Sequence, residues 1–219
     1  MDSFSENSEG DTAHFELAAD TLMAQDHCVI DGFVSEDEGR TLLEKLSQLH
    51  SEGQFHSATI GRQQEAHRDA SIRGDEILWL EKDMDDGPIR LFLSKMEAMI
   101  GFFNRHCYTG IRDFESHFAM YPPGSYYHRH LDQFRGTDSR KFTFILYLNF
   151  GWQPEDGGQL RIYLSGDEGE TVQDIEPLAC RLVCFRSANL PHEVLLTHKS
   201  RFSITGWWLD RERGLGFLR

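Results

Sequence analysis

The chain has few cysteines for its length. Only four of its 219 residues are cysteines, Cys28, Cys107, Cys180 and Cys184. They are too few and too scattered to form a disulfide framework in a chain of this size. Cys180 and Cys184 lie an even number of residues apart in an apolar run, so we interpret them as core thiols of a strand and not as a zinc or redox pair. We therefore expect a reduced protein.

Long apolar runs are also missing from the sequence. None approaches the roughly 20 residues that a membrane-spanning helix needs. The first residues, MDSFSENSEGDT, are acidic and have neither the cationic nor the apolar region of a signal peptide. Together with the reduced cysteines, these absences predict a cytoplasmic protein without a membrane partner.

Basic residues are in the minority. The chain has 22 Lys and Arg against 36 Asp and Glu, which gives a net charge of −14. This charge repels polyanions and argues against nucleic acid or an anionic membrane surface as a partner. A neutral or basic protein is the more reasonable partner, and we expect the chain itself to be a monomer.

The length fits one domain, because all-β barrels and sandwiches of this size commonly occur undivided. Residues 1–16 are polar and acidic and are predicted to form a flexible tail, followed by a single domain over residues 17–219. A capping-box pattern at Ser35 and Glu38 predicts a helix over residues 36–50. Apolar residues at helical spacing, with Pro88 in the first turn, predict a second amphipathic helix over residues 88–105.

Strand patterns dominate the rest of the chain. They are separated by turns rich in Gly, Pro and Asp and are predicted at residues 27–34, 72–81, 114–121, 142–149, 159–164, 181–185, 194–197 and 202–209. Because helices come first and strands follow without regular alternation, we expect an α+β protein. Its catalytic half would be an antiparallel sandwich or jelly roll.

The sequence YPPGSYYHRHLD at residues 121–132 contains the first candidate for chemistry. His130 and Asp132 are two residues apart, and side chains at this spacing on a strand point to the same face. A third ligand would come from another strand, and His192 after Pro191 is suitably placed. Two His and one carboxylate on one side of a metal, with the other positions open, are typical of Fe(II) oxygenases. Alternatively, His128 and His130 are both ligands and Asp132 supports them.

Arg201 is the second candidate, because a cation in the apolar sequence SRFSITGWW at residues 200–208 is costly unless it is paired. The carboxylate of a bound diacid would pair with both nitrogens of the guanidinium fork. Tyr147 could add a hydroxyl bond to the same carboxylate. A solvent-exposed arginine on an edge strand is the alternative.

A series of motifs along the chain resembles the prolyl hydroxylases of the oxygen-sensing type, and their bacterial members most of all. These enzymes are 2-oxoglutarate- and Fe(II)-dependent dioxygenases. The resemblance covers roughly residues 31–210 and rests on an ordered set of segments at residues 72–79, 121–122, 130–132, 147–149, 157–161, 175–177, 191–194 and 201–207.

The resemblance implies a double-stranded β-helix of the cupin-like jelly-roll type, supported by N-terminal amphipathic helices. It implies Fe(2+) on His130, Asp132 and His192, with 2-oxoglutarate and O2 as cosubstrates and ascorbate as a candidate reductant. The remaining assignments are 2-oxoglutarate contacts by Arg201, Tyr147, Tyr121 and Thr205, and substrate contacts by Arg73, Asp75, Trp79, Tyr127 and Arg140. The segment at residues 53–71 would cover the substrate.

The reaction implied by the resemblance is 4-hydroxylation of a prolyl residue in a cytosolic protein, with release of succinate and CO2. Likeness to the bacterial members suggests a translation factor with a flexible prolyl loop, such as elongation factor Tu. Two alternatives stay open: the same chemistry on free proline, a peptide or another small molecule, and a cupin-like metal-binding module that does not turn over.

Overall fold

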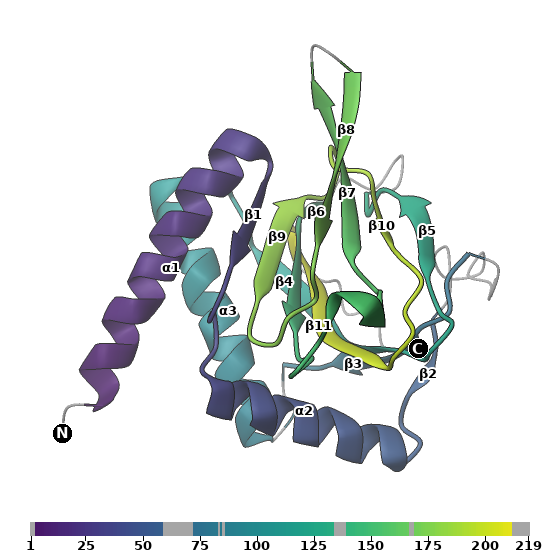
Figure 1. The fold of residues 1–219 in the computed structure, drawn as a ribbon. Coiled ribbons are helices and arrows are strands. Elements are labelled where there is room, and N and C mark those ends of the chain that lie inside the picture. The colour runs from purple at the N-terminus through teal and green to yellow at the C-terminus, as the bar shows by residue number, and fades with distance from the viewer. Residues whose placement is uncertain are drawn as a thin grey trace.

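A computed structural model of the chain describes residues 3–58, 72–82, 84, 86–133, 139–166 and 169–211, with residues 3–9 described by their backbone alone. Within these ranges the strands form two antiparallel sheets, and the helices lie along one side of the larger sheet (Figure 1). The predicted α+β jelly roll is therefore confirmed. Most of the proposed substrate-covering segment at residues 53–71 lies outside the described residues.

The larger sheet has seven strands in the order β1-β9-β6-β11-β4-β3-β2. Its long central strand β11 pairs antiparallel with β4 on one side and β6 on the other. The strands are β1 (His27–Ile30), β2 (His56–Ser57), β3 (Glu76–Leu80), β4 (Asp113–Tyr121), β6 (Arg140–Tyr147), β9 (Leu182–Arg186) and β11 (Arg201–Leu209).

The smaller sheet has four strands in the order β5-β10-β7-β8 and faces the larger one (Figure 1). They are β5 (Tyr127–His130), β7 (Leu160–Gly166), β8 (Gly169–Ile175) and β10 (His192–Val194). Strand β8 was not predicted from the sequence. All of its residues except Ile175 are exposed, so it lacks the apolar alternation by which a strand is recognised.

The described structure also has a short 3-10 helix (Pro154–Asp156) and three α-helices: α1 (Ser3–Gln25), α2 (Glu36–Ser51) and α3 (Gly87–His106). Helix α2 begins with the predicted capping box, in which the backbone N–H of Glu38 donates to the Ser35 hydroxyl over 3.2 Å. Helix α3 is capped by Asp86, which accepts from the N–H of Ile89. None of the described helices is long and apolar enough to cross a membrane.

Residues 3–16 of the predicted flexible tail belong to helix α1. Phe15, Ala18 and Leu22 are buried on one side of this helix and join the core beneath it. Their spacing of three and four residues is helical, but the acidic residues around them hid the pattern in the sequence. The expected boundary at residue 16 thus falls inside a helix.

Side chains on β4 alternate as predicted between two environments. Phe114 and Phe118 are buried in the core between the larger sheet and the helices, while Ala119 and Tyr121 belong to a second apolar cluster on the other face. Helix α3 supplies Phe103, which packs edge-on against Trp208 at 5.1 Å. The helices therefore close one face of the sheet, and the other face is left for the space between the two sheets.

Candidate metal centre

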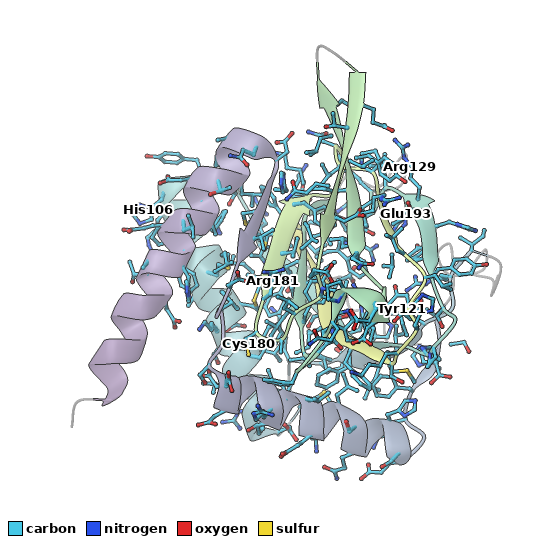
Figure 2. The ribbon with its side chains drawn as sticks, viewed as in Figure 1. His106, Tyr121, Arg129, Cys180, Arg181 and Glu193 are labelled. Carbon is cyan, nitrogen blue, oxygen red and sulfur yellow. The ribbon has the colours of Figure 1, made fainter. Side chains whose placement is uncertain are left out.

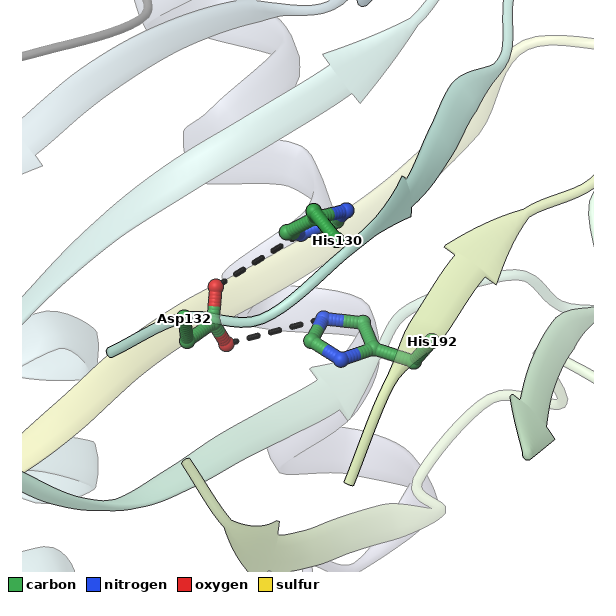
Figure 3. A group of neighbouring side chains, drawn as sticks. All are labelled: His130, Asp132 and His192. Atoms are coloured by element: carbon green, nitrogen blue, oxygen red, sulfur yellow. Dashed lines mark ion pairs between the residues drawn. The ribbon is translucent and has the colours of Figure 1, made fainter. Parts of the chain in front are cut away.

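Three side chains that lie far apart in the sequence meet between the two sheets. His130, Asp132 and His192 each offer a ligand atom, and these atoms all lie within 4.8 Å of one another (Figure 3). The Nε2 atoms of His130 and His192 are each 3.6 Å from an oxygen of Asp132. Within the described ranges, no other group of His, Cys, Asp and Glu has this arrangement.

The two histidines are brought together by strand pairing. His192 on β10 lies opposite His130 on β5 in the antiparallel register. The Nδ1 of His130 lies 2.7 Å from the carbonyl of His128, and the Nδ1 of His192 lies 3.0 Å from the carbonyl of Leu190. Because a carbonyl only accepts, each Nδ1 carries the proton, which leaves both Nε2 atoms free for a metal.

The placement of Asp132 differs from the expectation. Strand β5 ends at His130, and Asp132 lies in the bend that follows (Figure 3). The carboxylate is therefore not held by the alternation of a strand. Its oxygen Oδ2 accepts a hydrogen bond of 2.7 Å from the hydroxyl of Thr143 on β6.

The protonation states of the cluster suit a cation. Burial and, to a smaller extent, the nearby His130 lower the pKa of His192 to about 4. Burial alone would raise the pKa of Asp132, but the two histidines and the Thr143 hydroxyl together hold that pKa well below its ordinary value. At neutral pH the site thus presents a neutral imidazole on His192 and an ionised carboxylate. A metal needs its ligands in these states, and mixed His and carboxylate ligands fit Fe(II).

His128 lies on the same strand as His130 but is exposed and stands outside the cluster. Its ring packs against Tyr126 at 4.7 Å. The alternative pair of His128 and His130 therefore has no support in the geometry.

A cavity of about 180 Å³ opens beside the triad, between the two sheets. Arg201 and Thr205 on β11 line it together with Tyr121 on β4 (Tyr121 is labelled in Figure 2). Tyr147 does not line the cavity but lies fully buried behind Arg201, whose guanidinium carbon is 4.9 Å from the Tyr147 ring centre. Burial raises the pKa of Tyr147, so its hydroxyl stays protonated.

Arg201 itself is 1% exposed. Its Nε donates to the carbonyl of Gly158 over 2.9 Å, while Nη2 has no hydrogen-bond partner in the described structure. The hydroxyl of Tyr147 is also buried without a partner there. No described carboxylate lies within ion-pair distance of this cation. Because Arg201 is buried and lies on the central strand β11, it is not the solvent-exposed arginine on an edge strand that was the alternative.

The five predicted substrate residues all line the same cavity: Arg73, Asp75, Trp79, Tyr127 and Arg140. Several of them are already paired with protein groups. Arg73 donates to both oxygens of Asp75, over 2.7 and 2.6 Å, and its guanidinium carbon lies 4.5 Å from the ring centre of Tyr127. Tyr127 in turn stacks on His130 with the ring centres 3.7 Å apart.

Arg140 bonds to the carboxylate of Glu115 over 2.6 Å and lies over the ring of Trp207 at 3.5 Å. Trp207 and His117 are cavity-lining residues that were not predicted as site residues. Both could have been found by strand parity, since His117 is four residues from Tyr121 on β4 and Trp207 is two residues from Thr205 on β11. Burial and the charge of Arg73 lower the pKa of His117 to about 3.

Comparison with known proteins places this geometry in a family. The model of the 2OG-Fe(II) oxygenase superfamily matches residues 116–209. Mouse prolyl hydroxylase EGLN3 is 32% identical over 193 residues, which cover 84% of this chain and 79% of that protein. A Pseudomonas putida prolyl-4-hydroxylase structure superposes with a TM-score of 0.80 at 38% identity, covering 91% of this chain and all of that one.

A Trichoplax adhaerens prolyl hydroxylase, solved in complex with a peptide fragment of the hypoxia inducible factor oxygen degradation domain, has a TM-score of 0.82 and 27% identity. This match covers 94% of this chain and 93% of that one. The chain spans about half the length, 44 to 55%, of the Egl nine homolog 1 proteins of mouse, rat and human.

The ligand set and these matches agree on the cofactor. Fe(II) is held by His130, Asp132 and His192, and 2-oxoglutarate is the cosubstrate. The chain belongs to the 2OG-Fe(II) oxygenase superfamily and, within it, to the Egl nine type of prolyl hydroxylases.

Proposed function

We propose that this protein is a 2-oxoglutarate- and Fe(II)-dependent dioxygenase that hydroxylates C4 of a prolyl residue in another protein. The observation that carries this proposal is the buried, unpaired Arg201 in the same cavity as the metal triad. A metal-binding module that does not turn over has no use for such a cation, whereas a diacid cosubstrate supplies the missing anion.

Arg201 is the proposed seat for the distal carboxylate of 2-oxoglutarate, because it lines the cavity and its free Nη2 can donate to a carboxylate. Tyr147 is buried beside the guanidinium and does not line the cavity, so its unpartnered hydroxyl reaches the carboxylate only if cosubstrate binding opens the space next to Arg201. The rings of Tyr121 and Tyr147 lie about the guanidinium, with centres 5.1 and 4.9 Å from its central carbon. They exclude water from the ion pair, which strengthens it. Thr205, on the same strand, also lines the cavity.

The bound Fe(II) supplies the oxidative chemistry, in which 2-oxoglutarate and O2 become succinate and CO2 and one oxygen atom is inserted into the substrate. The protein positions the reactants and keeps bulk water out. Trp79 and Trp207 form aromatic walls of the cavity with their ring centres 6.3 Å apart. Burial raises the pKa of Tyr127 to about 12, so this tyrosine remains neutral beside His130.

The proposed substrate contacts lie at the same cavity. Arg73 and Asp75 form an ion pair that is almost wholly buried, and Arg140 is fixed between Glu115 and Trp207. These paired groups shape the cavity and do not offer free charges. We therefore propose that Arg73 and Arg140 act on the substrate through the rings they support, Tyr127 and Trp207.

We propose a protein substrate with a flexible prolyl loop. The support is the Trichoplax relative, whose structure holds a polypeptide segment. Elongation factor Tu is the specific candidate, and the net charge of −14 favours a partner of neutral or basic surface.

Four free cysteines support a reducing, cytoplasmic location. Ascorbate is the proposed reductant, and we expect one catalytic domain that includes helix α1.

The test is to load the protein with Fe(II) and 2-oxoglutarate under anaerobic conditions and then admit air in the presence of three substrates in parallel. These are intact elongation factor Tu from the source organism, a peptide with its prolyl loop, and free proline. Mass spectrometry measures the gain of one oxygen atom, and amino-acid analysis of the hydrolysate separates 4-hydroxyproline from its 3-isomer. The Asp132→Ala variant is the inactive control.

Hydroxylation of the intact protein alone, or of protein and peptide, supports the proposal. Preference for free proline would move the substrate to the small-molecule alternative. Absence of 2-oxoglutarate binding would leave only the metal-binding module.

A further inference from the structure

The position of Asp132 calls for support from outside its own strand. His130 and His192 are held by a cross-strand pair, but Asp132 lies in the bend after β5. Two contacts join this bend to the larger sheet. Asp132 accepts from Thr143 on β6, and the N–H of the next residue, Gln133, donates to the carbonyl of Ser187 over 3.3 Å.

Thr143 and Ser187 also contact each other. Their hydroxyl oxygens are 2.9 Å apart, and both residues are buried, with exposed fractions of 1% and 0%. Ser187 follows the end of β9, and its own N–H donates to the carbonyl of Lys141 on β6. The pair is therefore fixed to two strands of the larger sheet.

The direction of this hydrogen-bond chain follows from the number of protons. An ionised carboxylate has no proton to give, so the single hydroxyl proton of Thr143 points to Asp132. Thr143 can then only accept from Ser187, and the Ser187 hydroxyl is the donor. The chain runs from Ser187 through Thr143 to Oδ2 of Asp132, and successive donors in one direction polarise and strengthen each other.

Two buried hydroxyls at this place are not explained by packing. Ile145, Val183 and Phe185, their neighbours on the same strands, belong to an apolar cluster. Valine would fill the space of Thr143 and suit the strand better. The hydroxyls remain useful only if the carboxylate needs to be held.

We propose that Thr143 and Ser187 are positioning residues of the metal centre, which engage Oδ2 of Asp132 so that the carboxylate offers Oδ1 to the metal. A carboxylate that binds through one oxygen takes one coordination position and leaves the remaining ones for cosubstrate and O2. The inference concerns the metal site and does not depend on the identity of the prolyl substrate.

The test compares Thr143→Val, which keeps the shape and removes the donor, with Thr143→Ser, which keeps the donor. Mn(II) binding to the purified protein is measured by electron paramagnetic resonance, and the ligand-field absorption of the Co(II)-loaded protein reports how the carboxylate coordinates. Loss of a group that orients a metal ligand typically weakens binding about 10- to 100-fold. We expect a loss of this size for Thr143→Val, with an altered Co(II) spectrum.

Thr143→Ser should retain both the affinity and the spectrum, and Ser187→Ala should lose less affinity than Thr143→Val. Thr41→Val on α2, far from the site, controls for the chemical change. Wild-type affinity in Thr143→Val would overturn the inference, as would equal losses in Thr143→Ser and Thr143→Val, since the methyl group and not the hydroxyl would then matter.

If Thr143→Val does not fold, Ser187→Ala decides, and an unchanged Mn(II) affinity and Co(II) spectrum in that variant would refute the role. All readouts are independent of prolyl hydroxylation, so failure of that activity leaves the test intact.

Discussion

Replacing Arg201 by methionine should change two free energies in opposite directions. Arg201 is 1% exposed, and its Nη2 has no described hydrogen-bond partner. An uncompensated buried charge costs several kcal/mol, while the hydrogen bond from Arg201 to Gly158 returns only about 1 kcal/mol. We therefore expect the ligand-free Arg201→Met protein to be more stable than the wild type by about 1 to 3 kcal/mol.

The same change should weaken binding of 2-oxoglutarate strongly. Each hydrogen bond to a charged group contributes about 1.5 to 3 kcal/mol, and Arg201→Met removes the one from the free Nη2. That loss corresponds to a rise of roughly 10- to 150-fold in the dissociation constant. Urea unfolding of the metal-free protein measures the first effect, and calorimetric titration of the Mn(II)-loaded protein with 2-oxoglutarate measures the second.

Arg181 provides a matched control. Its guanidinium is bonded to the carboxylate of Asp31 over 2.6 Å, and it is labelled in Figure 2. Arg181→Met should therefore reduce stability and leave 2-oxoglutarate affinity unchanged. Our interpretation of Arg201 is refuted if its methionine variant loses stability as the Arg181 variant does and still binds 2-oxoglutarate with wild-type affinity.

Three further predictions concern other parts of the chain. His130→Ala should lose bound Fe(II), whereas His128→Ala should retain it, as measured by anaerobic metal analysis; equal loss would mean that the wrong pair was chosen. The lowered pKa of His117 means that the unfolded chain takes up a proton below about pH 6.5 while the folded chain resists until about pH 3. Stability should therefore fall as the pH falls through this window, by up to about 1.4 kcal/mol per pH unit, and His117→Leu should flatten that slope in urea unfolding at several pH values; an unchanged slope contradicts the assignment. A Cβ at Gly206 would lie 2.3 Å from the carbonyl oxygen of Glu115, so Gly206→Ala should lower the melting temperature strongly. Gly101→Ala on α3 would meet only the flexible end of an arginine side chain and should raise the melting temperature. Similar shifts for both variants would refute the steric reasoning.

Periodic patterns in the sequence predicted most of the fold. The alternation along β4 correctly separated Phe118, which packs against the helices, from Tyr121, which faces the cavity. The capping box at Ser35 located the start of α2 to the residue. The pattern failed where an element is exposed or its surroundings are acidic, as in β8 and the first turns of α1.

The candidate metal ligands could be selected from sequence, but the reason for their arrangement could not. His130 and Asp132 have the spacing of neighbours on one strand face, yet the strand ends between them. Nothing in the sequence distinguishes the hydroxyls of Thr143 and Ser187 from any others, because their contact with Asp132 joins segments that are distant along the chain. Long-range contacts of this kind are visible only in three dimensions.

The pairing of His130 with His192 has a consequence for how the smaller sheet opens. A metal bound to both histidines joins β5 to β10 and closes a loop of the intervening chain, as a reversible cross-link. By the chain-entropy relation for cross-links, closing a loop of about 60 residues lowers the conformational entropy of the unfolded chain, which raises its free energy by roughly 4 kcal/mol. Chelation would cut this link without breaking a covalent bond, so strand β5 should be the place where the metal-free protein first becomes sensitive to proteases. Bound iron would then determine how long the folded enzyme resists proteolysis as well as which reaction it catalyses.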